Sequence, residues 1–207
     1  SKQKMPLFQD FSNIKAKIHL WKYDETDFFD TEKLIEPENK SRIEEYHPKK
    51  LLETLMVRQI LKDELPDHKI LYEDRQPFLS PRDYEISITN SYPFAAIAFS
   101  KSPVGIDLEK FNPKMTRLKD KFVYPEEREF IPADLEMEYL TIIWSVKESL
   151  YKIHHSKHWS LKKHYEVLPF NMEHLHSVQC RVYDENGSDD FYARVEFFED
   201  YVFTIVD

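Results

Sequence analysis

Two short acidic motifs hold the residues of this chain that are best suited to chemistry. The first, GIDLEK, places Asp107 and Glu109 two residues apart, and the second, WSVKESLYK, contains Glu148 and Lys152. Carboxylate oxygens are the ligands that Mg²⁺ prefers in proteins, and a lysine beside such an ion can neutralise charge on a phosphate. The two motifs together therefore predict a site that holds a magnesium ion against a phosphate group.

A strand is expected to carry the first motif. Residues 104–108 alternate apolar and polar side chains, which puts Asp107 and Glu109 on the same side of the strand. Taken alone, this pattern is more often a half-buried strand that shows two solvated acids. The chain has only two glycines, so Gly105 at the start of this motif is expected to have a structural purpose.

A long helix is expected over residues 135–154, and it carries the second motif. Trp144, Glu148 and Lys152 are four residues apart and therefore share one helix face. An exposed Glu–Lys pair is the commoner reason for such spacing. The indole beside Glu148 favours instead a partly desolvated carboxylate, which is costly without a partner.

The composition limits the classes of protein that the chain can belong to. A content of 41% hydrophobic and 14% aromatic residues is enough for a packed core. No stretch approaches the roughly 20 apolar residues that span a bilayer, and the first residues lack the layout of a secretory signal. The single Cys180 excludes an internal disulfide, which fits a cytoplasmic location. The net charge of -9 argues against nonspecific binding of nucleic acid.

The remaining pattern predicts an α+β fold of two pseudo-symmetric α/β subdomains, residues 1–104 and 105–207. Each is expected to be a long helix packed on an antiparallel sheet with a closing meander, and the active site is expected in the cleft between them. The predicted helices are 31–46, 50–64, 125–130 and 135–154, and the predicted strands and hairpins are 17–23, 70–72, 77–79, 84–100, 104–108, 165–167, 178–183, 192–198 and 201–206.

The two motifs, in this order, resemble those of the 4′-phosphopantetheinyl transferases, in particular the larger, two-subdomain type that activates surfactin synthetase. That family has (V/I)G(I/V)D(I/L)E followed by W(S/T)xKE(S/A)xxK, and both patterns are present here. ISITNS at residues 86–91 lies where the family has an SHS motif. YEDRQP at residues 72–77 lies where it has a glycine, a lysine and a proline. The resemblance covers roughly residues 38–167.

The resemblance implies transfer of the phosphopantetheine arm of coenzyme A to a serine of an acyl or peptidyl carrier protein, with release of 3′,5′-ADP. Asp107, Glu109 and Glu148 would bind Mg²⁺. Glu148 would also be the general base for the serine, and Lys152 would stabilise the leaving diphosphate. Because a carboxylate bound to magnesium is a weaker base, a metal-bound water could share that task. Coenzyme A contacts are implied for Lys49, Arg75, Gln76, Asn90, Ser91, Asp107, Lys147 and Lys152.

Three departures from the family pattern concern the coenzyme A contacts. Asn90 stands in the place of the family histidine and offers a neutral amide in its stead. Arg75 and Gln76 replace the glycine and the lysine, and Arg75 could supply the missing charge from a neighbouring position. The sequence HHSKHWS, after Lys152 and Ile153, replaces a glycine-rich turn.

Two other groups of residues invite a functional reading. His154, His155 and His158 invite a metal-site reading because His154 and His158 could share a helical face, but no third ligand for that face is apparent nearby. Basic residues that close a helix are the commoner explanation. A basic segment is either a solvated loop or the docking patch for an acidic carrier protein, with two apolar residues that are either anchors or core. Its residues are Lys114, Met115, Arg117, Lys119, Lys121 and Phe122.

Two alternatives to a working transferase remain open. One is a noncatalytic relative that binds carrier protein or coenzyme A, and the other is a magnesium-dependent phosphohydrolase. The presence of all three acids and of Lys152 favours the enzyme, since a relative without activity would be free to lose them. We expect a monomer, because a chain of two subdomains can form within one molecule the type of cleft that smaller relatives assemble between subunits.

Overall fold

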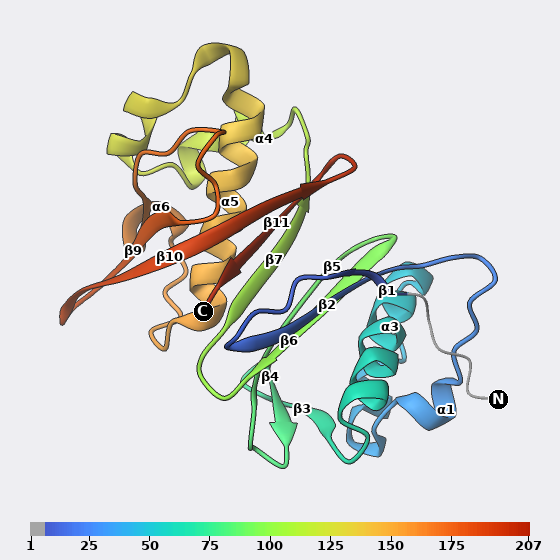
Figure 1. Cartoon of the computed structure of the whole chain (residues 1–207). Helices are drawn as coiled ribbons and strands as arrows, with labels where there is room; N and C mark the ends of the chain where they lie inside the picture. The colour runs from blue at the N-terminus through green and yellow to red at the C-terminus, as the bar shows by residue number, and fades with distance from the viewer. Residues whose placement is uncertain (1–6) are drawn as a thin grey trace. The chain divides into compact units, whose positions relative to one another are not determined.

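The computed structural model describes residues 7–207, and the chain divides into two compact units, Ser1–Val104 and Gly105–Asp207. Each unit contains one long helix and antiparallel strands (Figure 1). The fold is therefore α+β with antiparallel sheets, as the sequence predicts. The pseudo-symmetry of the two halves and the cleft between them stay predictions.

The first unit is built on a four-stranded sheet in the order β1-β2-β6-β5. The long helix α3, Pro48–Glu64, packs against β6 and β5, and its apolar side chains form a core with the sheet. The strands are β1 Leu7–Asp10, β2 Ala16–Lys22, β5 Glu85–Ser91 and β6 Phe94–Ser100, and a separate hairpin joins β3 Lys69–Glu73 to β4 Gln76–Ser80.

The helix predicted over residues 31–46 is wrong, because the chain there forms three short pieces. These are α1 Thr31–Leu34, a 3-10 turn at Pro37–Asn39 and α2 Lys40–Ile43. Proline has no backbone N–H and disfavours helical geometry at the residue before it, so Pro37 ends α1.

The second unit contains a five-stranded sheet in the order β7-β11-β10-β9-β8, with β7 at one edge. The helix α5, Glu136–Ile153, packs against β7, β11 and β8. The strands are β7 Gly105–Lys110, β8 Tyr165–Val167, β9 Val178–Asp184, β10 Gly187–Phe198 and β11 Tyr201–Val206, and the short helices are α4 Met115–Leu118, η2 Lys119–Lys121, η3 Pro125–Phe130, η4 Ala133–Leu135 and α6 Leu161–His164.

Neighbouring residues fix the start of the long helix α3 and the end of the long helix α5. In α3, Pro48 is the first residue and the imidazole of His47 accepts a hydrogen bond from the backbone of Lys49. In α5, the ammonium of Lys157 donates to the carbonyls of Tyr151 and Lys152, which would otherwise lack helical partners. The predicted helices 50–64 and 135–154 are confirmed.

The closing meander predicted for both halves is present only in the second. There, β8, β9, β10 and β11 pair in sequence. In the first unit, β3 and β4 pair only with each other, and β6 continues the sheet by pairing with β2. The N-terminal half of β10 was not predicted, because Gly187–Asp190 is exposed and lacks the apolar alternation that marks a half-buried strand.

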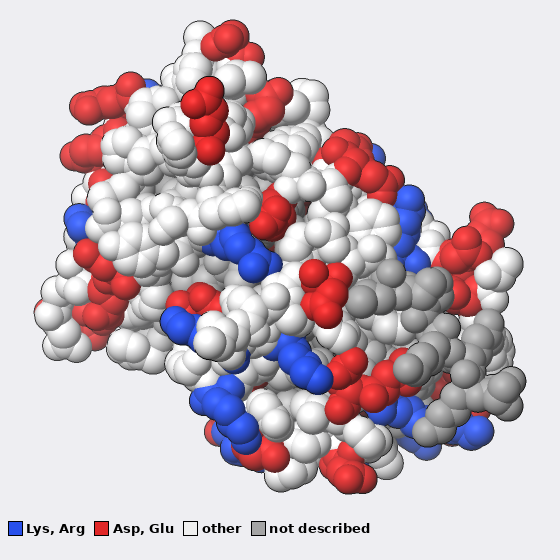
Figure 2. Space-filling view, viewed as in Figure 1, with Lys and Arg blue, Asp and Glu red and all other residues white. Residues whose placement is uncertain are grey.

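Charged side chains are distributed over both units. On the face in Figure 2, acidic and basic residues are interspersed. Across residues 7–207, the structure contains no helix that is long and apolar enough to cross a bilayer.

Candidate active site

The helix α5 lies very close to the edge strand β7, and Gly105 makes this approach possible. A Cβ atom at this position would lie 2.2 Å from the backbone oxygen of Ser149 on the helix. Since strand side chains alternate, Asp107 and Glu109 point to the same side as Gly105, toward α5. Gly105 therefore has a structural purpose, as predicted. That purpose is close packing of the helix and not an unusual backbone angle.

The acids of β7 contact the face of α5 that carries the second motif. The indole Nε1 of Trp144 donates to the carboxylate of Glu109 at 2.9 Å. Glu148 lies one turn further along the helix, and Lys152 lies two turns further. The ammonium of Lys152 donates to the backbone oxygen of Ile106 at 2.8 Å and lies 3.5 Å from Oδ1 of Asp107. Strand and helix thus bring together the acids that the sequence predicts, although the indole binds Glu109 and not Glu148.

A buried cluster of three hydroxyl groups fixes the helix against the sheet. The hydroxyl of Thr204 on β11 lies 2.9 Å from that of Ser145 and 2.7 Å from that of Ser149. Ser145 also approaches the backbone oxygen of Asp107 at 3.4 Å. Sequence reasoning missed this cluster, including Thr204. The available signal was a single polar residue within the apolar strand YVFTIV.

Burial raises the pKa of all three carboxyl groups, and the charge of Asp107 adds to the shift in Glu109 and Glu148. Burial raises the pKa of Asp107, and Lys152 partly opposes the shift. Burial and then the negative charge of Asp107 raise the pKa of Glu109 to about 8. The same two causes raise the pKa of Glu148 to about 7. When all three acids are ionised, the single lysine cannot balance their negative charge, and a bound cation would take the place of the protons.

These acids fit the requirements of a divalent ion. The Oδ2 atom of Asp107 is buried and has no hydrogen-bond partner among residues 7–207, which leaves a lone pair for a ligand. In that part of the chain, the three acids do not form a group whose ligand atoms all lie within 4.8 Å of one another. Binding one ion through all three would therefore require them to close, which the repulsion between them opposes until a cation is present.

The contact of Lys147 with coenzyme A is contradicted by the structure. Its side chain is fully buried and donates to Glu127 at 2.7 Å and to the backbone oxygens of Phe122 and Leu161. The same carboxylate accepts a hydrogen bond from the backbone of Val167 on β8. Lys147 therefore anchors α5 to the segments before and after it. Sequence reasoning missed its partner Glu127, because nothing in PEERE distinguishes the buried acid from its exposed neighbours.

The basic segment keeps its cations at the surface but not its apolar residues. Met115 and Phe122 are 6% and 0% exposed and belong to the core, so the prediction that they anchor a partner is wrong. The ammonium of Lys119 contacts Glu136 at 3.2 Å. Three exposed cations form no ion pair within the part of the chain that the structure describes, and they are Lys114, Arg117 and Lys121.

The residues predicted to bind coenzyme A from the first unit lie on two of its elements. Lys49, at the start of α3, places its ammonium 5.0 Å from the ring of Tyr92, the residue that follows Ser91 and the end of β5. The exposed Asn90 lies on the same strand end, so these residues share one region. Arg75 is exposed at the tip of the β3–β4 hairpin, with Gln76 at the start of β4.

The second unit is thus an antiparallel sheet crossed by one helix, with acids and a lysine at the crossing. The family model described as the 4′-phosphopantetheinyl transferase superfamily matches residues 103–206. The chain therefore belongs to this superfamily of transferases, and the resemblance is confirmed at that level. The match covers the second unit, and the assignment to the larger, two-subdomain type stays a prediction. The comparison with curated proteins gives no match.

Proposed function

We propose that this protein transfers the 4′-phosphopantetheine arm of coenzyme A to a serine of an acyl or peptidyl carrier protein. The serine oxygen attacks the β-phosphorus of the coenzyme A diphosphate. The bond from this phosphorus to the bridging oxygen breaks, and 3′,5′-ADP leaves. The observation that carries the proposal is the gathering of Asp107, Glu109 and Glu148 beside Lys152 in a chain of this superfamily.

The acids are proposed to hold Mg²⁺, which would neutralise charge on the diphosphate. Asp107 and Glu109 come from one strand and Glu148 from the facing helix, so the ion would be bound from two sides by hard oxygen ligands. The orphaned oxygen of Asp107 and the excess negative charge support this role. Lys152 keeps its ammonium beside Asp107, where it can also contact a diphosphate oxygen.

Glu148 is proposed to accept the proton of the carrier serine. In the metal-free protein its pKa is about 7, which is close to the value that suits a general base near neutral pH. Because bound Mg²⁺ would make the carboxylate a weaker base, a metal-bound water would share the task. Its neighbour Trp144 is half-buried and donates to Glu109, so the indole N–H does not occupy the carboxylate of Glu148.

Coenzyme A and the carrier protein are proposed to contact further residues. For coenzyme A these are Lys49, Arg75, Gln76, Asn90 and Ser91 of the first unit, and their support is the shared region of Lys49 and the end of β5. For the acidic carrier protein they are Lys114, Arg117, Lys119 and Lys121. The protein is further proposed to act in the cytoplasm as a monomer, without binding nucleic acid or a membrane.

The direct test follows the mass of the carrier protein. The protein is incubated with Mg²⁺, coenzyme A and a panel of apo carrier proteins, and the same reactions are run with a chelator. Addition of the phosphopantetheine arm that needs the metal is the expected result. Coenzyme A binding without addition across the panel would contradict the proposal and favour a noncatalytic binding protein. Release of inorganic phosphate or pyrophosphate without a carrier would favour a phosphohydrolase.

A matched pair of variants tests the role of Glu148. We expect Glu148→Gln to lower the transfer rate by at least about a hundredfold, because a general base typically contributes 10²–10⁴-fold. The control is Glu138→Gln on the same helix, for which a rate close to that of the unaltered protein is expected. Circular dichroism checks that both variants fold. A Glu148→Gln variant that keeps its rate would remove this residue from the mechanism.

A further inference from the structure

A second group of potential metal ligands lies at the C-terminal end of α5. The segment that begins at the C-cap residue of the helix contains three histidines, His154, His155 and His158. Each faces a carboxylate of the β9–β10 hairpin. The closest nitrogen–oxygen distances are 2.7 Å for His154 and Asp189, 3.8 Å for His155 and Asp184, and 3.5 Å for His158 and Glu185.

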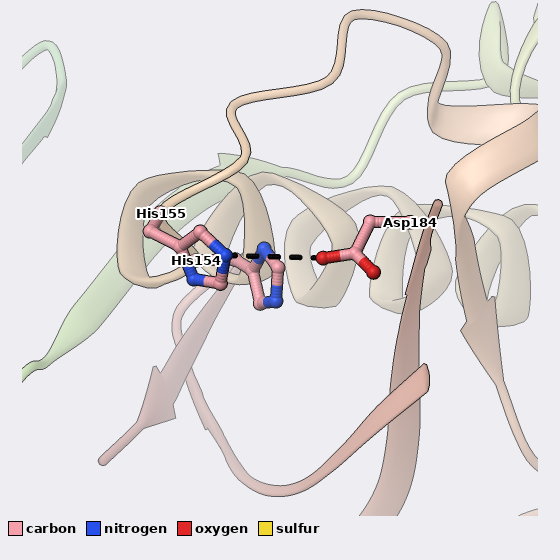
Figure 3. Close-up of side chains that lie close together, drawn as sticks. All are labelled: His154, His155 and Asp184. Carbon is pink, nitrogen blue, oxygen red and sulfur yellow. Dashed lines mark ion pairs between the residues drawn. The ribbon is translucent and has the colours of Figure 1, made fainter. Parts of the chain in front are cut away.

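Three of these side chains converge. Ligand atoms of His154, His155 and Asp184 lie within 4.8 Å of one another, and they are the one such group in the part of the chain that the structure describes. Figure 3 shows the two imidazoles side by side, with the carboxylate of Asp184 directed at His155. The imidazole rings stack with centroids 4.3 Å apart. Sequence reasoning found no third ligand because Asp184 is contributed by a distant strand, β9.

The carboxylate of Asp184 is positioned before any ion binds. Its side chain is only 7% exposed, and its Oδ1 accepts a hydrogen bond from the backbone of Asn186 at 2.9 Å. Its Oδ2 faces the imidazole of His155. A buried carboxylate is costly unless a cation or several donors satisfy it. The fixed orientation therefore favours a ligand that approaches from the side of the two histidines.

The two histidines differ in a way that suits a site with one fixed and one movable ligand. His154 is 3% exposed, and its ring nitrogens contact the hydroxyl of Ser156 and the carboxylate of Asp189, both at 2.7 Å. An ion would replace one of these contacts, and the other would orient the ring, as outer partners of ligating histidines do. His155 has a side chain that is 77% exposed, so it can turn toward the ion.

We propose that His154, His155 and Asp184 bind a zinc ion, with water completing a tetrahedral site. Two imidazole nitrogens and one carboxylate oxygen are a donor set that zinc accepts and that magnesium does not favour. The site is separate from the three carboxylates at the β7–α5 crossing. It joins the end of the helix that carries Glu148 and Lys152 to the β9–β10 hairpin. Zinc there would hold the end of α5 in place.

The test is a titration of the full-length protein with Zn²⁺ and with Co²⁺, both in excess Mg²⁺ so that the three carboxylates hold magnesium. Calorimetry with Zn²⁺ is expected to give one saturable site. Co²⁺ is expected to give the visible absorption of a tetrahedral nitrogen–oxygen complex, and Zn²⁺ should displace it. His155→Gln and Asp184→Asn should each weaken binding by at least about tenfold. Both positions can change without loss of the buried His154.

The matched control is His176→Gln. His176 has a 78% exposed side chain and lies 3.6 Å from the carboxylate of Glu196, so it reproduces the exposure and the acidic neighbour of His155. Among residues 7–207, it belongs to no group of three convergent metal ligands. His176→Gln is expected to bind Zn²⁺ with the affinity of the unaltered protein. The proposal is overturned if no saturable site is found, or if His155→Gln and Asp184→Asn bind as tightly as the control. In either case the contacts are ion pairs that fasten the hairpin.

Discussion

Each of the two units packs one long helix on an antiparallel sheet, and a buried charged group of the first unit differs from the acids at the β7–α5 crossing of the second. In each, the strand before the long helix pairs with the last strand of the unit, β2 with β6 and β7 with β11. In the first unit, the buried guanidinium of Arg58 is paired with the carboxylate of Glu36 and with the hydroxyl of Tyr72. In the second, three acids share one nearby lysine. Balanced charge serves the fold, whereas unbalanced charge indicates a ligand.

The pairing in the first unit is complete. The Arg58 side chain is 5% exposed and that of Glu36 is 6% exposed, and the amide of Asn39 donates a further hydrogen bond to Glu36 at 2.6 Å. The carboxylate of Glu36 thus has donors from two side chains. The same kind of substitution, removal of one buried charge, is therefore expected to have opposite effects in the two units.

The largest effect is expected for Arg58→Met. It leaves Glu36 buried without its cation, which costs about 3–5 kcal/mol of unfolding free energy for typical buried pairs. Urea titration measures the loss. The double variant Arg58→Met/Glu36→Leu is the control, and it should recover most of the stability because no charge is left unpaired. A single variant that loses less than about 1 kcal/mol would show that the pair is not structural.

A smaller loss is expected for Gly105→Ala in the second unit. The new methyl group would lie 2.2 Å from the backbone oxygen of Ser149, so α5 must move away from β7. Overpacking of this kind costs about 1–3 kcal/mol. Transfer should also fall, because the acids of β7 lose their register with the helix. Lys110→Ala, at the exposed end of the same strand, is the control. An unchanged transfer rate in Gly105→Ala would contradict the close packing.

In contrast to the two changes above, Glu109→Gln is expected to raise the stability of the metal-free protein. The pKa of Glu109 is about 8 in the folded protein and near 4.5 when exposed, so between these values only the folded protein holds the proton. Stability of the metal-free protein therefore falls as the pH rises through this window. At pH 8 without metal, the variant should gain at least about 1 kcal/mol, or roughly 2–4 °C in Tm.

At pH 5 the advantage of Glu109→Gln should disappear, since the glutamate is then protonated in the fold. Excess Mg²⁺ should stabilise the unaltered protein at pH 8 and not the variant. Glu129→Gln, an exposed acid of the same unit, is the control and should show neither effect. Scanning calorimetry at both pH values gives the answer. An equal Tm difference at pH 5 and pH 8 would rule out the raised pKa as its cause.

The smallest effect is expected at the tip of the β3–β4 hairpin. Asp74 and Arg75 have φ angles of 50° and 68°, which favour glycine. Arg75→Gly should therefore stabilise the first unit by about 0.5 kcal/mol. Arg75→Ala keeps the strained angle, so it should give no stabilisation. If Arg75 contacts coenzyme A, both variants weaken its binding alike, which calorimetry with coenzyme A measures. Unchanged affinity in both would remove Arg75 from the binding residues.

The parts of the site that depend on local spacing could be predicted from the sequence. Alternation along β7 put Asp107 and Glu109 on one face, and the four-residue spacing on α5 aligned Glu148 with Lys152. These periodicities follow from backbone geometry alone. The two motifs also carried the resemblance to the superfamily, and each long helix could be located from its apolar spacing.

Which of the remaining polar residues are buried, and what they contact, follows from the fold and not from the local sequence. Lys147 is a neighbour of Glu148 in the sequence, yet it is enclosed with Glu127, and Phe122 lies in the core and not on a docking surface. Asp184 reaches the histidines after α5 from a strand about thirty residues away in the sequence. Such contacts are made across the chain by packing, and packing depends on how distant elements fill the space between them, which no local period encodes.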